Sequence, residues 1–391
     1  MLDLSPMKNK KISFVCSGGV AKAAAWHLGV ALALDDMGFS FKHNNSDADS
    51  PSSLEISSFV GSSAGAMVCL YLTCGYSPQD VINSTLRMEN ALFPAFTYKD
   101  FFTMRRPGKA KLKKELASSF DGFPALIQKM ISPITQISGL FSTAGIADYI
   151  RNHIIHSENF EDFDADLFIV GTQLDHSRKV IFSKYNYPNP NHDSTAEYYT
   201  GISVVDAACA SMAVPPFFCP HPIKNPVNDD LEYYIDGEIR ETLSTHVAKD
   251  NGANYIISSW THTPYHYHHE VGSLVNYGIP SICLQAIYLM IQKKIVASRA
   301  REATSKDIVD SVSTYMISEK FNDKNRKDIL TILERKLNYN ANVKYIDIFP
   351  SHTNYQLFFG NSFSLNPKLL SQIVRTGYKR TFHSLKNYKW D

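Results

Sequence analysis

Residues 59–68 read FVGSSAGAMV, in which five small residues separate two apolar runs. The preceding residues 54–60 are typical of a buried strand, and the residues that follow are typical of a helix. The pattern G-x-S-x-G at such a junction indicates a tight, strained turn that presents Ser63 at a helix N-terminus. Side chains at Gly61 and Gly65 would collide across that turn. The stretch therefore predicts an α/β fold with Ser63 as a nucleophile, although small residues also cluster in ordinary loops.

The N-terminal segment repeats the same strand, turn and helix pattern. Residues 11–16, KISFVC, predict a short buried strand, and residues 17–39 predict a helix that Gly38 ends. The loop Ser17-Gly18-Gly19 between them can point successive N–H groups at one oxygen atom. A phosphate cradle is the competing interpretation, but neither G-x-x-x-x-G-K-[ST] nor G-x-G-x-x-G is present. We therefore expect the loop to bind an oxyanion.

A third segment, YYIDGEI at residues 233–239, supplies a candidate base. Asp236 follows apolar strand residues and precedes Gly237, and active sites of α/β proteins collect at the ends of strands. The alternative is an Asp-Gly pair that only makes a turn.

The remaining sequence extends this α/β pattern. Residues 166–174 and 178–185 predict a strand hairpin, residues 203–218 a helix ended by Pro215, and residues 254–260 a strand. Residues from about 85 to 160 resemble an inserted helical cap, which includes the basic run RRPGKAKLKK at 105–114 and an apolar region at 123–147. Residues 301–391 are helix-rich and carry 15 Lys and Arg against 9 Asp and Glu, a net charge of +6.

Composition limits the class of protein. With 391 residues, 44% hydrophobic and 20% charged, the chain can bury a large core, and its net charge of +1 gives no reason to expect nucleic acid as a partner. The six cysteines form no C-x-x-C pair, so we expect reduced thiols and no zinc site. The apolar run near the N-terminus is too short for a signal peptide. Residues 271–292 favour a buried or interfacial helix over a membrane span.

The motifs SGGVAK, GSSAG and DGE, in that order, resemble the patatin-like phospholipase family. The resemblance covers roughly residues 11–260 and is supported by GLFSTAGIADYI (139–150), FIVGTQLDHSRKVIFS (168–183), ASMAVPPFFCP (210–220) and GANYIISSW (252–260). It implies a three-layer α/β/α fold with a mostly parallel sheet. The corresponding domain would span 8–300 with the cap inserted at about 85–160, and 301–391 would form a C-terminal extension.

The resemblance also implies roles for single residues. Ser63 would be the nucleophile and Asp236 its base, in a dyad without a catalytic histidine and without a metal or organic cofactor. The site would also contain an oxyanion and substrate-binding loop, with Gly61, Gly65 and Gly237 as motif residues; the loop set is Ser17, Gly18, Gly19, Val20, Lys22 and Ala64.

Two departures from the family pattern concern this site. The loop has two glycines where three are usual, and Lys22 is displaced by one position, so the donor atoms of the oxyanion loop stay open. Glu238 stands where the family has glycine or alanine. It would raise the pKa of Asp236 if both were desolvated, but we expect it to point into solvent.

These observations predict a lipid acyl hydrolase of phospholipase A or lysophospholipase type. A catalytically inactive lipid- or partner-binding protein on the same fold is the alternative. His176 or His246 could complete a Ser-Asp-His triad. The histidines of THTPYHYHHE, among them His262, favour polar surface over a metal site.

The expected partners are membrane glycerolipids or phospholipids, contacted peripherally through the basic and apolar cap, with a protein activator as a further candidate. The expected localisation is cytoplasmic or peripheral on membranes. Since some patatin-like proteins are bacterial effectors, a secreted effector is a further possibility.

Overall fold

A mixed sheet of ten strands forms the centre of the computed structural model, which describes residues 3–44, 53–104, 138–186 and 196–388. The main strand order is β12-β11-β1-β3-β6-β10-β9, with β2 beside β3, β7 beside β6, and β8 beside β7. The strands are β1 (Ile12–Cys16), β2 (Ser40–Phe41), β3 (Glu55–Gly61), β6 (Asp166–Gln173), β7 (Lys179–Phe182), β8 (Ala196–Tyr199), β9 (His221–Lys224), β10 (Leu231–Asp236), β11 (Tyr255–Ser259) and β12 (Lys344–Ile348).

The strand directions confirm a mostly parallel sheet. Strands β12, β11, β1, β3 and β6 run parallel to one another, and β10 runs antiparallel to β6. Strands β6 and β7 pair antiparallel, which confirms the predicted hairpin. Because β10 runs the other way, it enters from beyond the carboxyl edge of the parallel strands and ends opposite Gly171 of β6. Gly61, the last residue of β3, pairs with Ile169 of β6. The carboxyl ends of β3 and β10 therefore lie at nearly the same position along β6.

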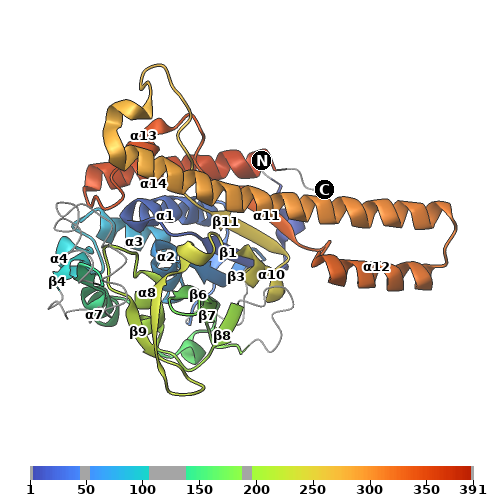
Figure 1. The fold of residues 1–391 in the computed structure, drawn as a ribbon, viewed down its shortest axis with the longest axis horizontal. Coiled ribbons are helices and arrows are strands. Elements are labelled where there is room, and N and C mark those ends of the chain that lie inside the picture. Colours follow the sequence, from blue (N-terminus) through green and yellow to red (C-terminus); the bar gives the residue numbers. More distant parts are fainter. Residues whose placement is uncertain (1–2, 45–52, 105–137, 187–195, 389–391) are drawn as a thin grey trace, which may run out of the picture.

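Helices cover both faces of the sheet, which confirms the three-layer α/β/α architecture (Figure 1). One face carries α1 (Val20–Asp36), α2 (Ala64–Thr73), α8 (Val204–Ser211) and α14 (Pro367–Lys386). The other face carries α10 (Thr245–Asp250) and the middle of α11 (Gly278–Ser318).

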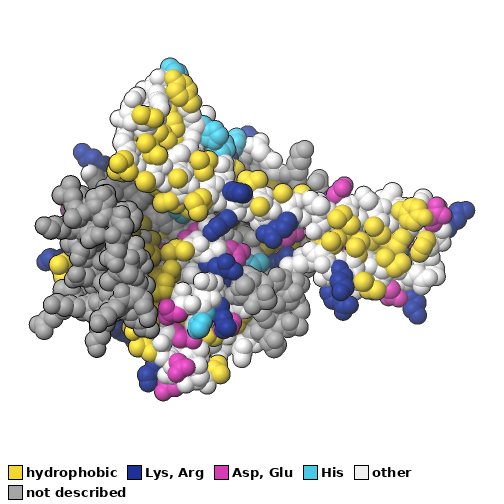
Figure 2. Space-filling view, viewed as in Figure 1, with side chains coloured by type: hydrophobic (Ala, Val, Ile, Leu, Met, Phe, Trp, Pro, Cys, Tyr) yellow, Lys and Arg dark blue, Asp and Glu magenta, His cyan; other side chains and the backbone are white. Residues whose placement is uncertain are grey.

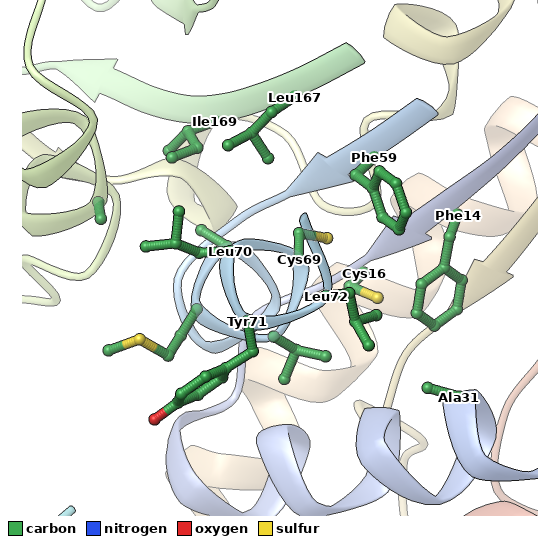
Figure 3. Close-up of a cluster of buried hydrophobic side chains, with 14 of the residues drawn as sticks. Phe14, Cys16, Ala31, Phe59, Cys69, Leu70, Tyr71, Leu72, Leu167 and Ile169 are labelled. Atoms are coloured by element: carbon green, nitrogen blue, oxygen red, sulfur yellow. The ribbon is translucent and has the colours of Figure 1, made fainter. Parts of the chain in front are cut away.

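The strands are buried on both faces because alternate side chains enter different cores. Phe14 and Phe59 pack in the core under α1 and α2, whereas Val15 and Val60 pack in the core under α10 and α11. Figure 3 shows Phe14 and Phe59 directed toward the α2 layer, where Leu72 lies. This explains the near-continuous apolar runs in the sequence.

The remaining elements connect or extend these layers. Residues of the expected cap that the structure describes form short elements, while 105–137, which includes the basic run, lies outside the described residues. The other elements are η1 (Ser5–Met7), α3 (Pro78–Thr85), α4 (Tyr98–Phe101), β4 (Thr103–Met104), β5 (Phe141–Ser142), α7 (Ala144–His153), η3 (Phe160–Asp162), α9 (Gly237–Arg240), η4 (Leu274–Tyr277), α12 (Asp323–Leu337) and α13 (Tyr355–Phe359).

The C-terminal ninety residues divide into two structurally different parts. Helix α11 runs through residue 300, leaves the body and turns back as α12, as the orange hairpin in Figure 1 shows. In contrast, β12 completes the sheet beside β11, and α14 packs closely on α1. A Cβ at Gly29 of α1 would lie 2.0 Å from the carbonyl oxygen of Val374 in α14. The last helix is therefore built into the α1 layer.

The helix predicted to end at Pro215 ends at Ser211, four residues earlier. All six cysteines are free, and Cys283 is exposed whereas four others are buried. Among the described residues, one helix is long and apolar enough to cross a membrane; its span Leu274–Ser318 contains a window of mean hydropathy 1.5 of which 11% is buried.

Candidate active site

Ser63 lies on a strained turn between β3 and α2. Its φ of 52° and ψ of −123° fall in a region that residues with a side chain rarely adopt. The Ser63 N–H donates a hydrogen bond of 2.8 Å to Ser211 Oγ, and the Ser211 hydroxyl donates to the carbonyl oxygen of Val170 at 2.6 Å. Helix α8 thus contacts the turn directly, through Ser211, and β6 holds the Ser211 side chain in place.

The two glycines of the motif are required by close packing. A Cβ at Gly61 would lie 2.4 Å from Ala66 Cα, and one at Gly65 would lie 2.3 Å from the carbonyl oxygen of Cys16. Backbone atoms cannot move aside as a flexible side chain can. The small residues in the sequence therefore allow β3, α2 and β1 to approach closely enough to form the turn.

Asp236 contacts Ser63, although the two residues are far apart in the sequence. The side chain of Asp236 is buried and accepts a hydrogen bond of 2.9 Å from the Glu238 N–H, and the Ser63 hydroxyl lies close to the same carboxyl group. Burial raises the pKa of Asp236 to about 6, against the lowering effect of the nearby Ser63 hydroxyl. A carboxylate with this pKa can accept a proton near neutral pH.

The loop at Ser17–Gly19 lies beside the same serine. A Cβ at Gly18 would be 2.8 Å from Ser63 Cβ, and Gly19 has a φ of +129° that favours glycine. Val20 begins α1 and also has a positive φ of 59°. Ala64 is the first residue of α2, so its N–H is one of the free donors at that helix end. The structure thus places Gly18 against Ser63, with Ala64 next to it at the start of α2.

Lys22 is buried behind this loop. Its ammonium donates to the Tyr288 hydroxyl at 3.0 Å and to the carbonyl oxygen of Leu357 at 3.1 Å. No carboxylate among the described residues pairs with it. Lys22 therefore connects the start of α1 to α11 and α13, and supports the loop through these contacts.

Two buried histidines that sequence reasoning did not assign to the site also support the loop. His27 Nε2 lies 2.9 Å from the carbonyl oxygen of Ser17, and its Nδ1 lies 2.7 Å from Ser259 Oγ. Burial lowers the pKa of His27 to about 4. His262 lies 3.2 Å from the Cβ position of Gly19, and burial together with the Lys22 charge lowers its pKa to about 3. The expectation that this His-rich segment is all polar surface is wrong for His262.

Glu238 does not point into solvent as expected. Both of its carboxyl oxygens are buried, and its Cγ lies 2.7 Å from the Cβ position of Gly18. The Gly18 N–H and the Ser62 hydroxyl lie near the carboxyl group, but neither makes a well-aligned hydrogen bond to it. Burial and the neighbouring Asp236 raise the pKa of Glu238 to about 8. The turn geometry directs this side chain inward, toward the Gly18 N–H.

A narrow apolar cavity of about 100 Å³ opens beside Ser63. Its walls include Leu28 of α1, Met67 of α2, Phe101 of α4 and Met212, which follows α8. The cavity lies in the α1 and α2 layer, and the lining residues that the structure describes include none with a charged side chain. Such a lining suits a hydrocarbon chain.

The other histidines considered from the sequence have different surroundings. His246 Nδ1 lies 3.0 Å from Glu241 Oε1, and His176 lies in the exposed turn between β6 and β7. Within the described ranges, no group of three or more His, Cys, Asp or Glu side chains is placed to hold a metal ion.

Comparison with protein families gives a match that agrees with this architecture. The model of the family described as patatin-like phospholipase matches residues 14–249, more than half of the chain. The chain belongs to the patatin-like phospholipase family. The matched range contains the Ser63 turn, the Ser17–Gly19 loop and Asp236, and it ends before α11. No curated protein matches the chain. Family membership supports hydrolysis of lipids as the general class of activity.

Proposed function

We propose that this protein is a serine lipid acyl hydrolase of phospholipase A or lysophospholipase type, with Ser63 as nucleophile and Asp236 as general base. The observation that carries the proposal is the Ser63 hydroxyl on the buried Asp236 carboxyl, at the wall of an apolar cavity. A serine hydroxyl needs such a base because it is a weak nucleophile by itself.

The first half of the reaction acylates the enzyme. Asp236 takes the hydroxyl proton as Ser63 Oγ forms a bond to the ester carbonyl carbon. The N–H groups of Gly18, Gly19 and Ala64 hold the resulting oxyanion. The tetrahedral intermediate then breaks its bond to the alcohol oxygen, which leaves with the proton from Asp236. The product is an acyl-Ser63 ester and a free alcohol, such as a lysophospholipid.

The second half regenerates the serine. Asp236 removes a proton from water as the water oxygen attacks the acyl carbon, and the same donors hold the second oxyanion. The bond to Ser63 Oγ breaks, and the proton on Asp236 returns to that oxygen. The fatty acid leaves, and no cofactor or metal ion takes part in these steps.

Peripheral membrane contact is part of this proposal, because the substrates form surfaces. The outer face of the first half of α11 supports it: Ile279, Ile287 and Met290 are 76%, 52% and 64% exposed. Lys293 follows on the same helix, and a basic side chain next to an apolar face favours anionic lipid surfaces. We therefore infer that the protein is cytoplasmic or peripheral on membranes, or that it is a secreted effector that reaches membranes. A protein partner that activates it belongs to the same proposal.

A catalytically inactive lipid-binding protein is the second candidate, and Glu238 is the observation that favours it. Its buried carboxyl group stands beside the Gly18 N–H, where an oxyanion would bind. In the ionised form, it would repel that oxyanion.

Covalent labelling tests the proposed function. A fluorophosphonate probe is expected to label the wild-type protein and to fail with Ser63→Ala. Product analysis on phospholipid and lysophospholipid vesicles is expected to show fatty acid release that Asp236→Asn reduces at least about a hundredfold. If the intact wild-type protein is not labelled with or without lipid, the inactive alternative is correct.

A further inference from the structure

A second cavity, of about 640 Å³, lies on the opposite face of the sheet from the Ser63 cavity. It is bordered by α10, the middle of α11 and the end of α12. Six basic side chains from four elements line it: Lys179 (β7), Arg240 (α9), Lys249 (α10), and Lys294, Arg299 and Arg301 (α11). Figure 2 shows Lys and Arg side chains gathered below α11 in the middle of the molecule.

The nearby carboxylates neutralise only part of this positive charge. Glu241 contacts both Lys179 and His246. Glu302 forms an ion pair with Lys249 at 3.0 Å, and Asp347, outside the lining, forms one with Arg299 at 2.6 Å. Among the described residues, Lys294 and Arg301 make no such ion pair, so a surplus of positive charge remains on α11.

The surplus is concentrated at two side chains of α11. Lys294 donates a hydrogen bond of 3.1 Å to the carbonyl oxygen of Ile239, which carries no net charge, and Arg301 is exposed at the rim. Among the described residues, neither makes an ion pair. Two lysines deeper in the cavity, Lys179 and Lys249, are 1% and 8% exposed, so a ligand would meet desolvated cations as well as rim charges.

The neutral groups of the lining narrow the class of ligand. Thr242, Thr245, Ser298 and Ser305 line the cavity with hydroxyl groups, and His246 Nε2 is buried with no hydrogen-bond partner among the described residues. The aromatic residue among the lining residues, Tyr345, donates to Glu302 and is covered by the Arg299 guanidinium at 4.4 Å. One face of its ring is therefore already occupied by a cation.

We propose that this cavity binds a polyol that carries several phosphate groups, such as an inositol polyphosphate or the same group on a lipid. Its volume lies within the usual range for small-molecule sites, and basic side chains interspersed with hydroxyls match phosphates on a hydroxylated ring. The cavity also borders the turn that carries Asp236, since Arg240, Glu241 and Thr242 follow that turn directly. Binding itself requires no hydrolase activity.

Calorimetric titration with inositol hexakisphosphate, at near-physiological salt, tests the proposal. The double variant Lys294→Gln/Arg301→Gln removes two rim charges outside the proposed catalytic machinery and is expected to weaken binding at least about tenfold. The matched control Lys224→Gln/Lys368→Gln removes the same charge from exposed positions on β9 and α14 and is expected to bind like wild type. Melting temperatures without ligand are expected to agree among the three proteins.

Each outcome supports or overturns the site. Binding of the soluble probe that falls only in the cavity variant supports a free phosphorylated polyol. Binding only to vesicles that contain phosphatidylinositol phosphates, with the same variant pattern, supports a lipid headgroup. Absence of binding to both probes overturns the proposal, and so does equal weakening of binding in the two double variants. Displacement of inositol hexakisphosphate by heparin and DNA as effectively as by the unlabelled probe would also overturn it, because it would show binding to polyanions in general. Because Ser63→Ala is expected to bind as tightly as wild type, failure of the hydrolase proposal would be seen separately.

Discussion

At the residue scale, Asp236 and Glu238 form a pair of buried carboxyl groups with different surroundings. Asp236 contacts the Ser63 hydroxyl, whereas Glu238 lies against Gly18. Burial raises the pKa of Asp236 to about 6 and that of Glu238 to about 8, so near neutral pH the first is ionised and the second protonated. This combination supplies a base beside the serine and avoids a negative charge beside the oxyanion donors.

The pH dependence of kcat/KM follows from these two ionisations. Activity is expected to fall as pH drops below about 6, because Asp236 becomes protonated and cannot accept the serine proton. It is expected to fall again above about pH 8, because ionised Glu238 repels the developing oxyanion. Initial rates on a soluble short-chain ester, measured from acid to alkaline pH, would show a bell-shaped profile with two apparent pKa values that belong to the pair.

Glu238→Gln separates the two limbs of that profile. Glutamine keeps the shape of the side chain but cannot ionise, so the alkaline fall is expected to disappear while the acid fall remains. An unchanged alkaline limb in this variant would assign the limb to another group and remove Glu238 from the account.

Local sequence indicated site residues that lie in short motifs, but it did not indicate the contacts that distant segments make with them. Ser63, Gly61 and Gly65 lie in one turn, and Asp236 is the last residue of a strand that a short apolar run predicts. Lys22, His262 and Glu238 depend on contacts with α11, α13 and the Gly18 loop, which no neighbouring residues encode. The sequence analysis places Glu238 in solvent, but in the structure its carboxyl oxygens are buried and its side chain lies against Gly18.

At the element scale, the turn between β3 and α2 depends on two backbone approaches. Gly65→Ala would place a Cβ 2.3 Å from the Cys16 carbonyl oxygen in β1. We expect it to lower the free energy of unfolding by about 3 kcal/mol, since overpacking against backbone cannot be relieved by a rotamer change. Urea unfolding followed by circular dichroism measures this loss.

Gly360→Ala provides the matched control for the turn. Its Cβ would meet its closest neighbours at 3.4 Å, an ordinary contact, so a change of less than about 1 kcal/mol is expected. Similar losses in both variants would contradict the close-approach explanation for the motif glycines.

Helix α11 carries the element-scale prediction for membrane contact. Ile287→Glu/Met290→Glu places two charges on its exposed apolar face and is expected to reduce binding to anionic vesicles roughly tenfold or more, through lost apolar burial and added repulsion. Sedimentation with phosphatidylserine vesicles measures the bound fraction. Val227→Glu alters an apolar residue that is 86% exposed between β9 and β10, and it is expected to leave binding unchanged. Equal binding by the α11 variant and wild type would place membrane contact elsewhere.

At the whole-molecule scale, the α/β/α layers were predictable because β1, β3 and β6 occur in the sequence as apolar runs followed by turn residues. The order of the strands in the sheet was not predictable, because β12 follows the α11 and α12 hairpin in the sequence and β10 pairs antiparallel to β6. Non-local pairing of this kind leaves little trace in local sequence. The basic composition of residues 301–391 therefore concealed two parts, one integral to the fold and one that projects from it.

Deletion experiments distinguish these two parts. Replacing 306–335 by a short Gly-Ser linker removes most of the projecting hairpin, where Val309 and Met316 are buried. The ends to be joined are close, because Lys249 contacts both Glu302 and the carbonyl oxygen of Asn338. We expect a soluble protein whose melting temperature changes by no more than a few degrees.

Ending the chain at Asn366 removes fewer residues but should do far more damage. The α14 residues Leu370, Ile373 and Val374 are buried against α1, and their loss would expose the α1 surface around Gly29. At about 25 cal/mol per Å² of apolar surface, three such side chains contribute several kcal/mol, which is comparable to the whole stability of a domain. Insoluble or molten protein is expected from this truncation, with near-ultraviolet circular dichroism lost. A truncated chain that melts cooperatively near the wild-type temperature would show that the fold is complete without α14, contrary to the packing of α1 against it.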